Sequence, residues 1–156
     1  MFKIGVLSDT HLRVVSNDLK ELLRASLHDI DMLIHAGDMT SARVFDFLQN
    51  WNIKAVRGNM DDFELYSMIP QRRIEVINGK RFGIIHGSGS PQGIEKRVKA
   101  GFGDDVDVII FGHSHIPARI EIDGVTLFNP GSFRDSRTAG IIEISDNIDF
   151  RFISIK

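Results

Sequence analysis

Short apolar runs alternate with helix-like stretches over the first two thirds of the chain, and this alternation constrains the fold more than any other feature. The runs have the length of strands and cover residues 2–7, 32–34, 53–56, 81–85 and 106–111. Because most of them are apolar throughout, we expect both faces of their sheets to be covered. Strands separated by helices predict parallel βαβ units.

Three stretches between these runs are typical of helices. The first begins at Ser16 or Asn17 as N-cap and has one apolar face. That face consists of Leu19, Leu22, Leu23 and Leu27. The second begins after residue 40 or 41 and points three apolar side chains inward. The third covers residues 90–100, with Ser90 as N-cap and a proline at the first helical position.

Hairpin signals become frequent in the last third of the chain. Asp123-Gly124 separates two strand-like segments within residues 120–128, and Asp146-Asn147 does the same within residues 141–155. An earlier pair of strands, within residues 73–85, is joined by Asn78-Gly79, a strong turn signal. The pattern of βαβ units followed by antiparallel strands predicts an α/β fold of two packed sheets with helices outside.

Composition excludes several classes of protein. We expect one domain over residues 1–156, a chain long enough for a sizeable core. The absence of cysteine rules out disulfides and thiolate metal sites. The formal net charge of −2 gives no sign of the basic surface that binds nucleic acid or an anionic membrane. No apolar run approaches the ~20 residues of a membrane span, and no signal peptide is recognisable, so we expect a cytoplasmic protein.

Side chains that can bind metals follow five of the predicted strands. In chain order they are Asp9, His11, Asp38, Asn59, His86, His113 and His115. In open α/β sheets, ligands bind along the edge formed by the carboxyl ends of the strands. We therefore expect these seven side chains to converge at one place.

Taken alone, each of these residues has a simpler explanation. Asp9 and His11 could belong to a turn or a helix cap, and Asp38 could be a carboxylate at a helix N-terminus. Asn59 could be a turn residue after glycine, and His86 a buried core histidine. Their common position after strands favours metal binding for the whole set.

The residue types indicate which ions would bind. Two carboxylates, four imidazoles and one amide form a mixed nitrogen and oxygen set, which suits Mn²⁺, Fe²⁺, Co²⁺, Ni²⁺ or Zn²⁺. Seven ligands are too many for one ion with an open position, so they fit two ions that share a carboxylate. Two such ions, roughly 3.5–4 Å apart, can activate a water and stabilise both oxygens of an in-line displacement. Their net positive charge would attract a phosphate.

The motifs occur in the order Asp9-x-His11, Gly37-Asp38, Gly58-Asn59, His86 and Gly112-His113-x-His115. This order resembles the calcineurin-like metallophosphoesterase superfamily. The short length and the segment Asn129-Pro130-Gly131-Ser132 resemble its small subfamily of bacterial and archaeal phosphodiesterases. The resemblance covers residues 1–135. It implies a four-layer α-β-β-α sandwich of two mixed sheets with flanking helices.

The resemblance also implies a role for each ligand. One metal would be held by Asp9, His11 and His115, and the other by Asn59, His86 and His113. Asp38 would bridge the two, and Asn59 would help to position a phosphate oxygen, so we expect both to be catalytic residues. The nucleophile would be a metal-activated hydroxide. The implied cofactors are two divalent ions, with Mn²⁺ as the first expectation and Ni²⁺, Fe²⁺, Co²⁺ or Zn²⁺ as alternatives.

These implications predict a phosphodiesterase that acts on a small phosphate ester. The alternatives are a phosphomonoesterase or nucleotidase with the same centre, and a non-catalytic scaffold or interaction protein. Met60 stands where many family members have a histidine that protonates the leaving group, so we expect slow turnover that favours good leaving groups. Arg57 could reach a phosphate or be solvated. Residues 60–72 could line the site or form a homo-oligomer contact through Phe63, Tyr66 and Met68.

Overall fold

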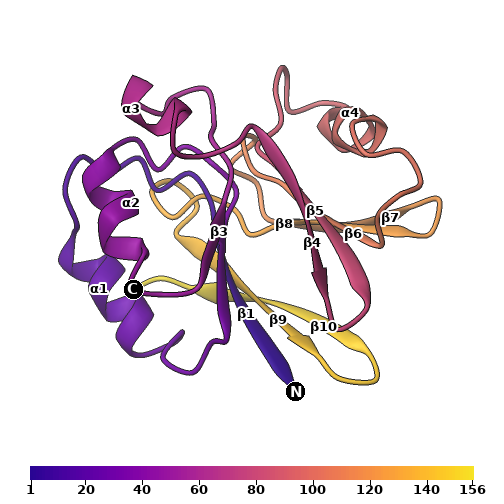
Figure 1. Cartoon of the computed structure of the whole chain (residues 1–156), viewed down its shortest axis with the longest axis horizontal. Coiled ribbons are helices and arrows are strands. Elements are labelled where there is room, and N and C mark those ends of the chain that lie inside the picture. The colour runs from indigo at the N-terminus through magenta and orange to yellow at the C-terminus, as the bar shows by residue number, and fades with distance from the viewer.

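The computed structural model describes residues 1–156 and contains two five-stranded sheets (Figure 1). Four of the apolar runs form central strands of these sheets. The first sheet has the order β10-β9-β1-β2-β3. Its strands are β1 (Phe2–Leu7), β2 (Met32–His35), β3 (Ile53–Ala55), β9 (Thr138–Ile144) and β10 (Ile148–Ser154). Strands β1, β2 and β3 are parallel, whereas β9 and β10 run antiparallel to their neighbours.

The second sheet has the order β4-β5-β6-β8-β7 and is also mixed. Strands β5, β6 and β8 are parallel, and β4 and β7 are antiparallel edge strands. The bounds are β4 (Arg72–Ile77), β5 (Lys80–Ile85), β6 (Val108–Ile110), β7 (Ala118–Ile122) and β8 (Val125–Asn129). All three hairpins predicted from turn residues are present: β4–β5, β7–β8 and β9–β10.

Serine side chains cap the first two helices, as the sequence predicts. Ser16 accepts a hydrogen bond from a backbone N–H of α1 (Asn17–Arg24), and Ser41 does the same for α2 (Ala42–Leu48). The predicted third helix begins later than expected, because left-handed Gly93 precedes α4 (Ile94–Ala100). The prediction of Ser90 as N-cap was therefore wrong. A short helix that was not predicted, α3 (Phe63–Tyr66), lies after β3. No helix could span a membrane.

Three clusters of buried apolar side chains separate four layers. In β1, Ile4 and Val6 point toward the second sheet, and Leu7 points toward α1 and α2. In β6, Val108 and Ile110 join the core between the sheets, whereas Ile109 packs on the side of α4. The order is therefore helices, sheet, sheet and helix, which confirms the predicted α-β-β-α sandwich. Figure 1 shows α1 and α2 on one outer side and α4 on the other.

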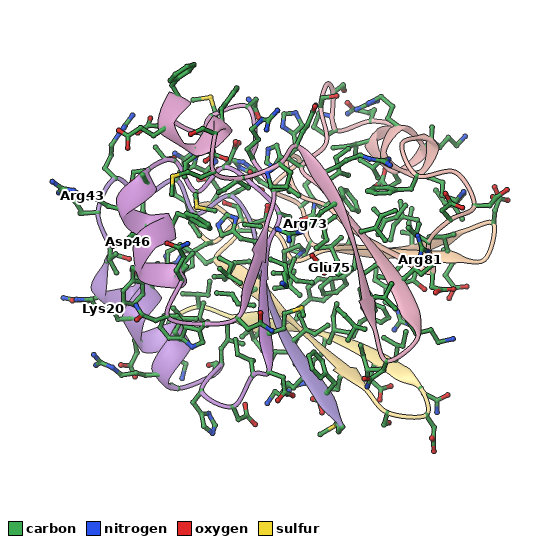
Figure 2. The ribbon with its side chains drawn as sticks, in the orientation of Figure 1. Lys20, Arg43, Asp46, Arg73, Glu75 and Arg81 are labelled. Atoms are coloured by element: carbon green, nitrogen blue, oxygen red, sulfur yellow. The ribbon has the colours of Figure 1, made fainter.

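A polar contact joins the edges of the two sheets. Arg73 on β4 donates to the carbonyl oxygen of Ala55 on β3 at 3.2 Å and pairs with Glu75 at 2.8 Å. Figure 2 shows Arg73 and Glu75 between these strands, whereas Lys20 and Arg43 project outward from α1 and α2. The contact therefore connects β3 and β4, which are edge strands of the two sheets.

Candidate metal centre

The loops at the carboxyl ends of the parallel strands carry the predicted ligands. Asp9 and His11 follow β1, and Asp38 follows β2 after one tight turn. His86 follows β5 directly, and His115 lies in the loop after β6. Because the two sheets pack face to face, these loops approach one another from both sheets.

Five of the seven predicted side chains meet in this space. Oδ1 of Asp9 lies 3.6 Å from Nε2 of His11, 3.2 Å from Nε2 of His115 and 3.7 Å from Nε2 of His86. Oδ2 of Asp38 lies 3.1 Å from Nε2 of His86 and 3.8 Å from Nε2 of His11. They form two triads suited to a metal ion, Asp9–His11–His115 and Asp9–Asp38–His86. Asp9 belongs to both triads.

The remaining two predicted ligands lie at the margin of this cluster. The ring of His113 is 5.2 Å from that of His86, and its Nε2 is 2.9 Å from the carbonyl oxygen of Gly89. Asn59 is exposed and lines a cavity that His86 also lines. Neither belongs to the two triads. The structure thus brings five predicted ligands together and places two beside them.

Each carboxylate of the cluster uses one oxygen for anchoring and turns the other to the imidazoles. Oδ2 of Asp9 accepts hydrogen bonds from the Ser8 hydroxyl at 2.7 Å and from the His113 backbone N–H at 3.1 Å. Oδ1 of Asp38 accepts from the Met60 backbone N–H at 2.8 Å. The free oxygens, Oδ1 of Asp9 and Oδ2 of Asp38, are those within 4 Å of the histidine rings.

Three buried polar atoms of the cluster have no hydrogen-bond partner. They are Oδ1 of Asp9, Nε2 of His11 and Nε2 of His86. An unsatisfied buried polar atom costs about 1–3 kcal/mol, so three of them in one place need an explanation. A cation between them would satisfy all three, because each atom carries a lone pair when the imidazoles are neutral. The residues present therefore fit divalent metal ions.

Burial and neighbouring charges set the protonation of the cluster. Burial raises the pKa of Asp9, but His11, His86, Ser8 and His115 outweigh it and leave the pKa lowered. The pKa of Asp38 is also lowered, because His86, Met60 and His11 overcome the effect of burial. Both carboxylates are therefore ionised at neutral pH. Such an anionic pair attracts cations.

Hydrogen bonds from the outer ring nitrogens orient three of the histidines. Nδ1 of His86 lies 2.7 Å from the carbonyl oxygen of Ala36, and Nδ1 of His115 lies 2.5 Å from Oδ2 of Asp135. In both rings Nδ1 therefore carries a proton, and Nε2 faces the cluster. Burial lowers the pKa of His86, but the hydrogen bond with Asp38 and the charges of Asp9 and Asp38 outweigh it and leave the pKa raised, so a metal ion would displace a proton from Nε2. In His113 the roles of the two ring nitrogens are exchanged, because Nε2 donates to the carbonyl oxygen of Gly89 and Nδ1 is left as the acceptor.

Sequence reasoning missed Asp61 as a functional residue. Its buried carboxylate accepts three backbone hydrogen bonds, from Asp38 at 3.1 Å, Thr40 at 2.7 Å and Gly58 at 2.7 Å. Asp61 thus ties the loop after β2 to the loop after β3. Burial raises the pKa of Asp61, although the three N–H groups act in the opposite direction. Its spacing of two residues from Asn59 was the only signal in the sequence.

Asp135 was missed for a different reason. It orients His115 across a separation of twenty residues, and no local pattern relates the two. Hydrogen bonding to Arg134 and to His115 lowers the pKa of Asp135 against a smaller opposing effect of burial. The carboxylate is therefore ionised and supports a proton on Nδ1 of His115.

Left-handed backbone conformations occur at every Asp and His of the predicted set except His86. The φ values are 52° at Asp9, 49° at His11, 60° at Asp38, 71° at His113 and 63° at His115. Such conformations are unfavourable for residues with a Cβ, at of order 1–3 kcal/mol each, and they concentrate at functional sites. The fold therefore holds these side chains in place against local preference.

Comparisons with known proteins agree with this geometry. Residues 2–146 match the calcineurin-like phosphoesterase superfamily domain. A probable metallophosphoesterase of Methanothermobacter thermautotrophicus is 35% identical over 132 residues, which cover 83% of this chain and 76% of that protein.

Two further relatives differ in what their names describe. The structure of an archaeal phosphodiesterase superposes with a TM-score of 0.73 at 27% identity, covering 98% of this chain and 99% of that one. Vacuolar protein sorting-associated protein 29 of Schizosaccharomyces pombe is 26% identical over 157 residues, which cover 95% of this chain and 81% of that protein.

Proposed function

Because the chain belongs to the calcineurin-like phosphoesterase superfamily, we propose that it hydrolyses phosphodiesters at a centre of two divalent metal ions. The observation that carries this proposal is the convergence of Asp9, His11, Asp38, His86 and His115, with three buried lone-pair atoms left without partners. A substrate of small size fits the cavity of about 360 Å³ beside the cluster.

One half of the proposed ligand set coincides with a triad: Asp9, His11 and His115 would hold one ion. Asn59, His86 and His113 would hold the other, although of these three only His86 belongs to the second triad. Asp38 is the proposed bridge, since its Oδ2 lies within 4 Å of both His11 and His86. Asp9 belongs to both triads, so its carboxylate could help to hold both ions.

The chain's own residues would orient the reaction. Bound ions supply positive charge for the phosphoryl oxygens and lower the pKa of an attacking water. Asn59 lines the cavity beside His86, where its exposed amide can donate to a phosphate oxygen. The mixed nitrogen and oxygen ligands suit first-row divalent metals, and among these Mn²⁺ is our first choice, with Ni²⁺, Fe²⁺, Co²⁺ and Zn²⁺ as alternatives.

The residue that follows Asn59 cannot donate a proton to the leaving group. Met60 occupies that position with 58% of its surface exposed, and a thioether carries no proton to transfer. We therefore infer slow turnover that improves as the leaving group becomes more acidic. Rates on a series of aryl phosphodiesters measure this dependence, and rates that are independent of leaving-group pKa would contradict it.

Mutation of the proposed bridge tests the metal centre. Asp38→Ala should abolish hydrolysis of bis(p-nitrophenyl) phosphate and reduce the bound metal below two ions per chain. Asp46→Ala, which removes a carboxylate from the outside of α2, is the matched control and should keep both. An active Asp38→Ala protein with full metal content would rule out the bridging role.

The second candidate function is that of a non-catalytic binding protein. The relationship to vacuolar protein sorting-associated protein 29 favours it, because that protein is named for sorting rather than for hydrolysis. The five converging ligands favour the enzyme. If the protein loaded with Mn²⁺ or Ni²⁺ hydrolyses neither aryl phosphodiesters nor aryl phosphomonoesters, the binding protein becomes the better description. Hydrolysis of monoesters alone would identify a phosphomonoesterase.

A further inference from the structure

A cavity of about 360 Å³ opens beside the metal centre. Its lining includes Asn59 and His86, which belong to the proposed ligand set. Its walls come from the loop after β3, from α3 and from the segment between β5 and α4. Two arginines, Arg57 and Arg97, also line it, and no carboxylate does. The lining therefore carries positive charge, and the cavity shares Asn59 and His86 with the proposed metal centre.

Arg57 is held in place but retains most of its hydrogen-bond donors. Its Nη1 donates to the carbonyl oxygen of Ile69 at 2.9 Å, and its guanidinium lies 4.9 Å from the ring centre of Tyr66. No carboxylate lies within ion-pair distance of it. A guanidinium has five N–H groups, so about four remain for a ligand. A fixed, half-buried cation without a counter-ion is suited to bind an anion.

Arg97 differs, because its donors are already used. Its guanidinium donates to the carbonyl oxygens of Ser88, Ser90 and Gln92, which shapes the wall formed by this segment. It adds positive charge to the cavity but offers few free donors. The hydrogen-bonding capacity of the cavity therefore depends on Arg57.

We propose that this cavity is a second anion-binding subsite and that Arg57 is its main ligand. The proposal rests on the proposed function and narrows its substrate class. The substrate would be a phosphodiester in which one esterified group carries a further negative charge, either a phosphate or a carboxylate. The scissile phosphate would occupy the metal centre, and the second anion would be bound by the guanidinium of Arg57.

Binding to the metal-free protein tests the subsite without any catalysis. Inorganic phosphate is titrated into chelated wild-type protein, and the NMR signals of the arginine side-chain Nε–H groups are followed. The Arg57 signal should shift saturably. The signal of Arg119, which stacks on Phe150 outside the cavity, should not. A shift at Arg57 no larger than that at Arg119 would overturn the proposal.

Inhibition of the metal-loaded protein provides the second measurement. Alkanediol bisphosphates and phosphonocarboxylates of several chain lengths are compared with alkyl monophosphates as competitors of an aryl phosphodiester. The bisphosphates and phosphonocarboxylates should bind more tightly than the monophosphates. If the bisphosphates bind best, the second anion of the substrate is a phosphate, and if the phosphonocarboxylates bind best, it is a carboxylate. Arg57→Met should reduce this preference about ten- to a hundredfold, as expected for lost hydrogen bonds to a charged group. Arg119→Met is the matched control and should retain the full preference.

The outcomes separate this proposal from the proposed function. An unchanged preference in Arg57→Met would overturn the subsite even if diesters are hydrolysed. A saturable Arg57 shift in a protein that hydrolyses no ester would support the subsite and remove the proposed activity. If Arg57→Met fails to fold, because it loses the contact with Tyr66, the wild-type NMR titration still decides the matter.

Discussion

At the scale of single residues, the centre depends on side chains that orient ligands rather than bind metal. Asp61 accepts backbone N–H groups from two ligand-bearing loops, and Asp135 fixes the tautomer of His115. Removing a residue of this kind leaves buried donors without acceptors, which is costly even though no metal contact is lost. Mutations at these positions should therefore affect metal affinity.

Asp61→Asn places an amide where the carboxylate now accepts three N–H groups. The NH₂ group that replaces one carboxylate oxygen would face a backbone N–H, so two donors would meet. We therefore expect about 1–3 kcal/mol less stability and weaker metal binding. Calorimetric metal titration and urea unfolding measure the two effects. Asp62→Asn changes a half-buried neighbour that pairs with Arg13 at 2.8 Å, and it should alter neither stability nor metal affinity. Unchanged metal affinity in Asp61→Asn would show that the residue does not position the ligands.

His35 provides a prediction about pH. It is fully buried, its Nδ1 accepts from the Gly37 N–H at 3.1 Å, and Nε2 contacts Thr10 Oγ1 at 3.1 Å. Burial lowers the pKa of His35 from 6.5 to about 4. Between pH 6.5 and pH 4 the His35 ring is protonated in the unfolded chain but not in the folded protein. Its contribution to the free energy of unfolding is therefore fully present above pH 6.5 and is lost as the pH falls toward 4. The loss from this group is at most roughly 3 kcal/mol.

Comparison with His35→Asn isolates this contribution. The asparagine oxygen can replace Nδ1 as an acceptor for Gly37 but does not titrate. Urea unfolding of the chelated proteins between pH 7.5 and 4 should give a smaller acid-side loss of stability for the variant. Parallel pH profiles for the two proteins would show that His35 is not the group responsible.

At the scale of elements, the turns between strands have two different purposes. Hairpin turns such as Asn78-Gly79 reverse the chain, with φ values of 49° and 78° that match the twist of β4 and β5. The loops after β1, β2, β3 and β6 instead carry predicted ligands. Gly58 belongs to this second kind, since a Cβ there would lie 2.1 Å from Oδ1 of Asp38.

Alanine substitutions at two glycines should separate these purposes. Gly79→Ala meets no neighbouring atom but has a positive φ, so we expect about 1–2 kcal/mol less stability and unchanged activity. Gly58→Ala should lose activity and metal affinity, because Asp38 must move. Thermal unfolding and hydrolysis of an aryl phosphodiester measure both variants. A fully active Gly58→Ala protein would contradict the close approach seen here.

At the scale of the whole molecule, the two sheets bring distant loops to one edge. The core between them, which includes Ile4, Ile84 and Phe128, fixes their relative position. That position determines the distance between Asp9 of the first sheet and His86 of the second. Metal binding and the packing of the sheets should therefore be coupled.

Removal of metal should lower thermal stability. An ion present at a hundred times its Kd adds about 2.7 kcal/mol to the free energy of unfolding, which is roughly 5–10 °C in Tm for a chain of this length. Chelation should lower Tm by this order, and added Mn²⁺ should restore it. Asp38→Ala should respond much less to Mn²⁺. Identical Tm values with and without metal would argue against a centre that spans both sheets.

Several parts of the fold could be predicted because their causes are local. Apolar runs indicated the strands, serines marked the starts of α1 and α2, and turns rich in Asp, Asn and Gly marked the hairpins. The start of α4 was predicted too early, because the left-handed conformation of Gly93 has no sequence signal. The short helix α3 was missed, since a single turn has too few residues to show periodicity.

The sequence alone determined which residues could bind metal and where along the strands they stand, because residue chemistry and strand ends are local properties. Its order of motifs also indicated the superfamily, which the comparisons confirm. Only the tertiary structure decided that Asp9 belongs to both triads and that Asp61 joins two loops. It also decided that Arg57 lines a cavity without a carboxylate partner. These contacts depend on the packing of one sheet against the other, and residues far apart in the chain meet only after that packing forms.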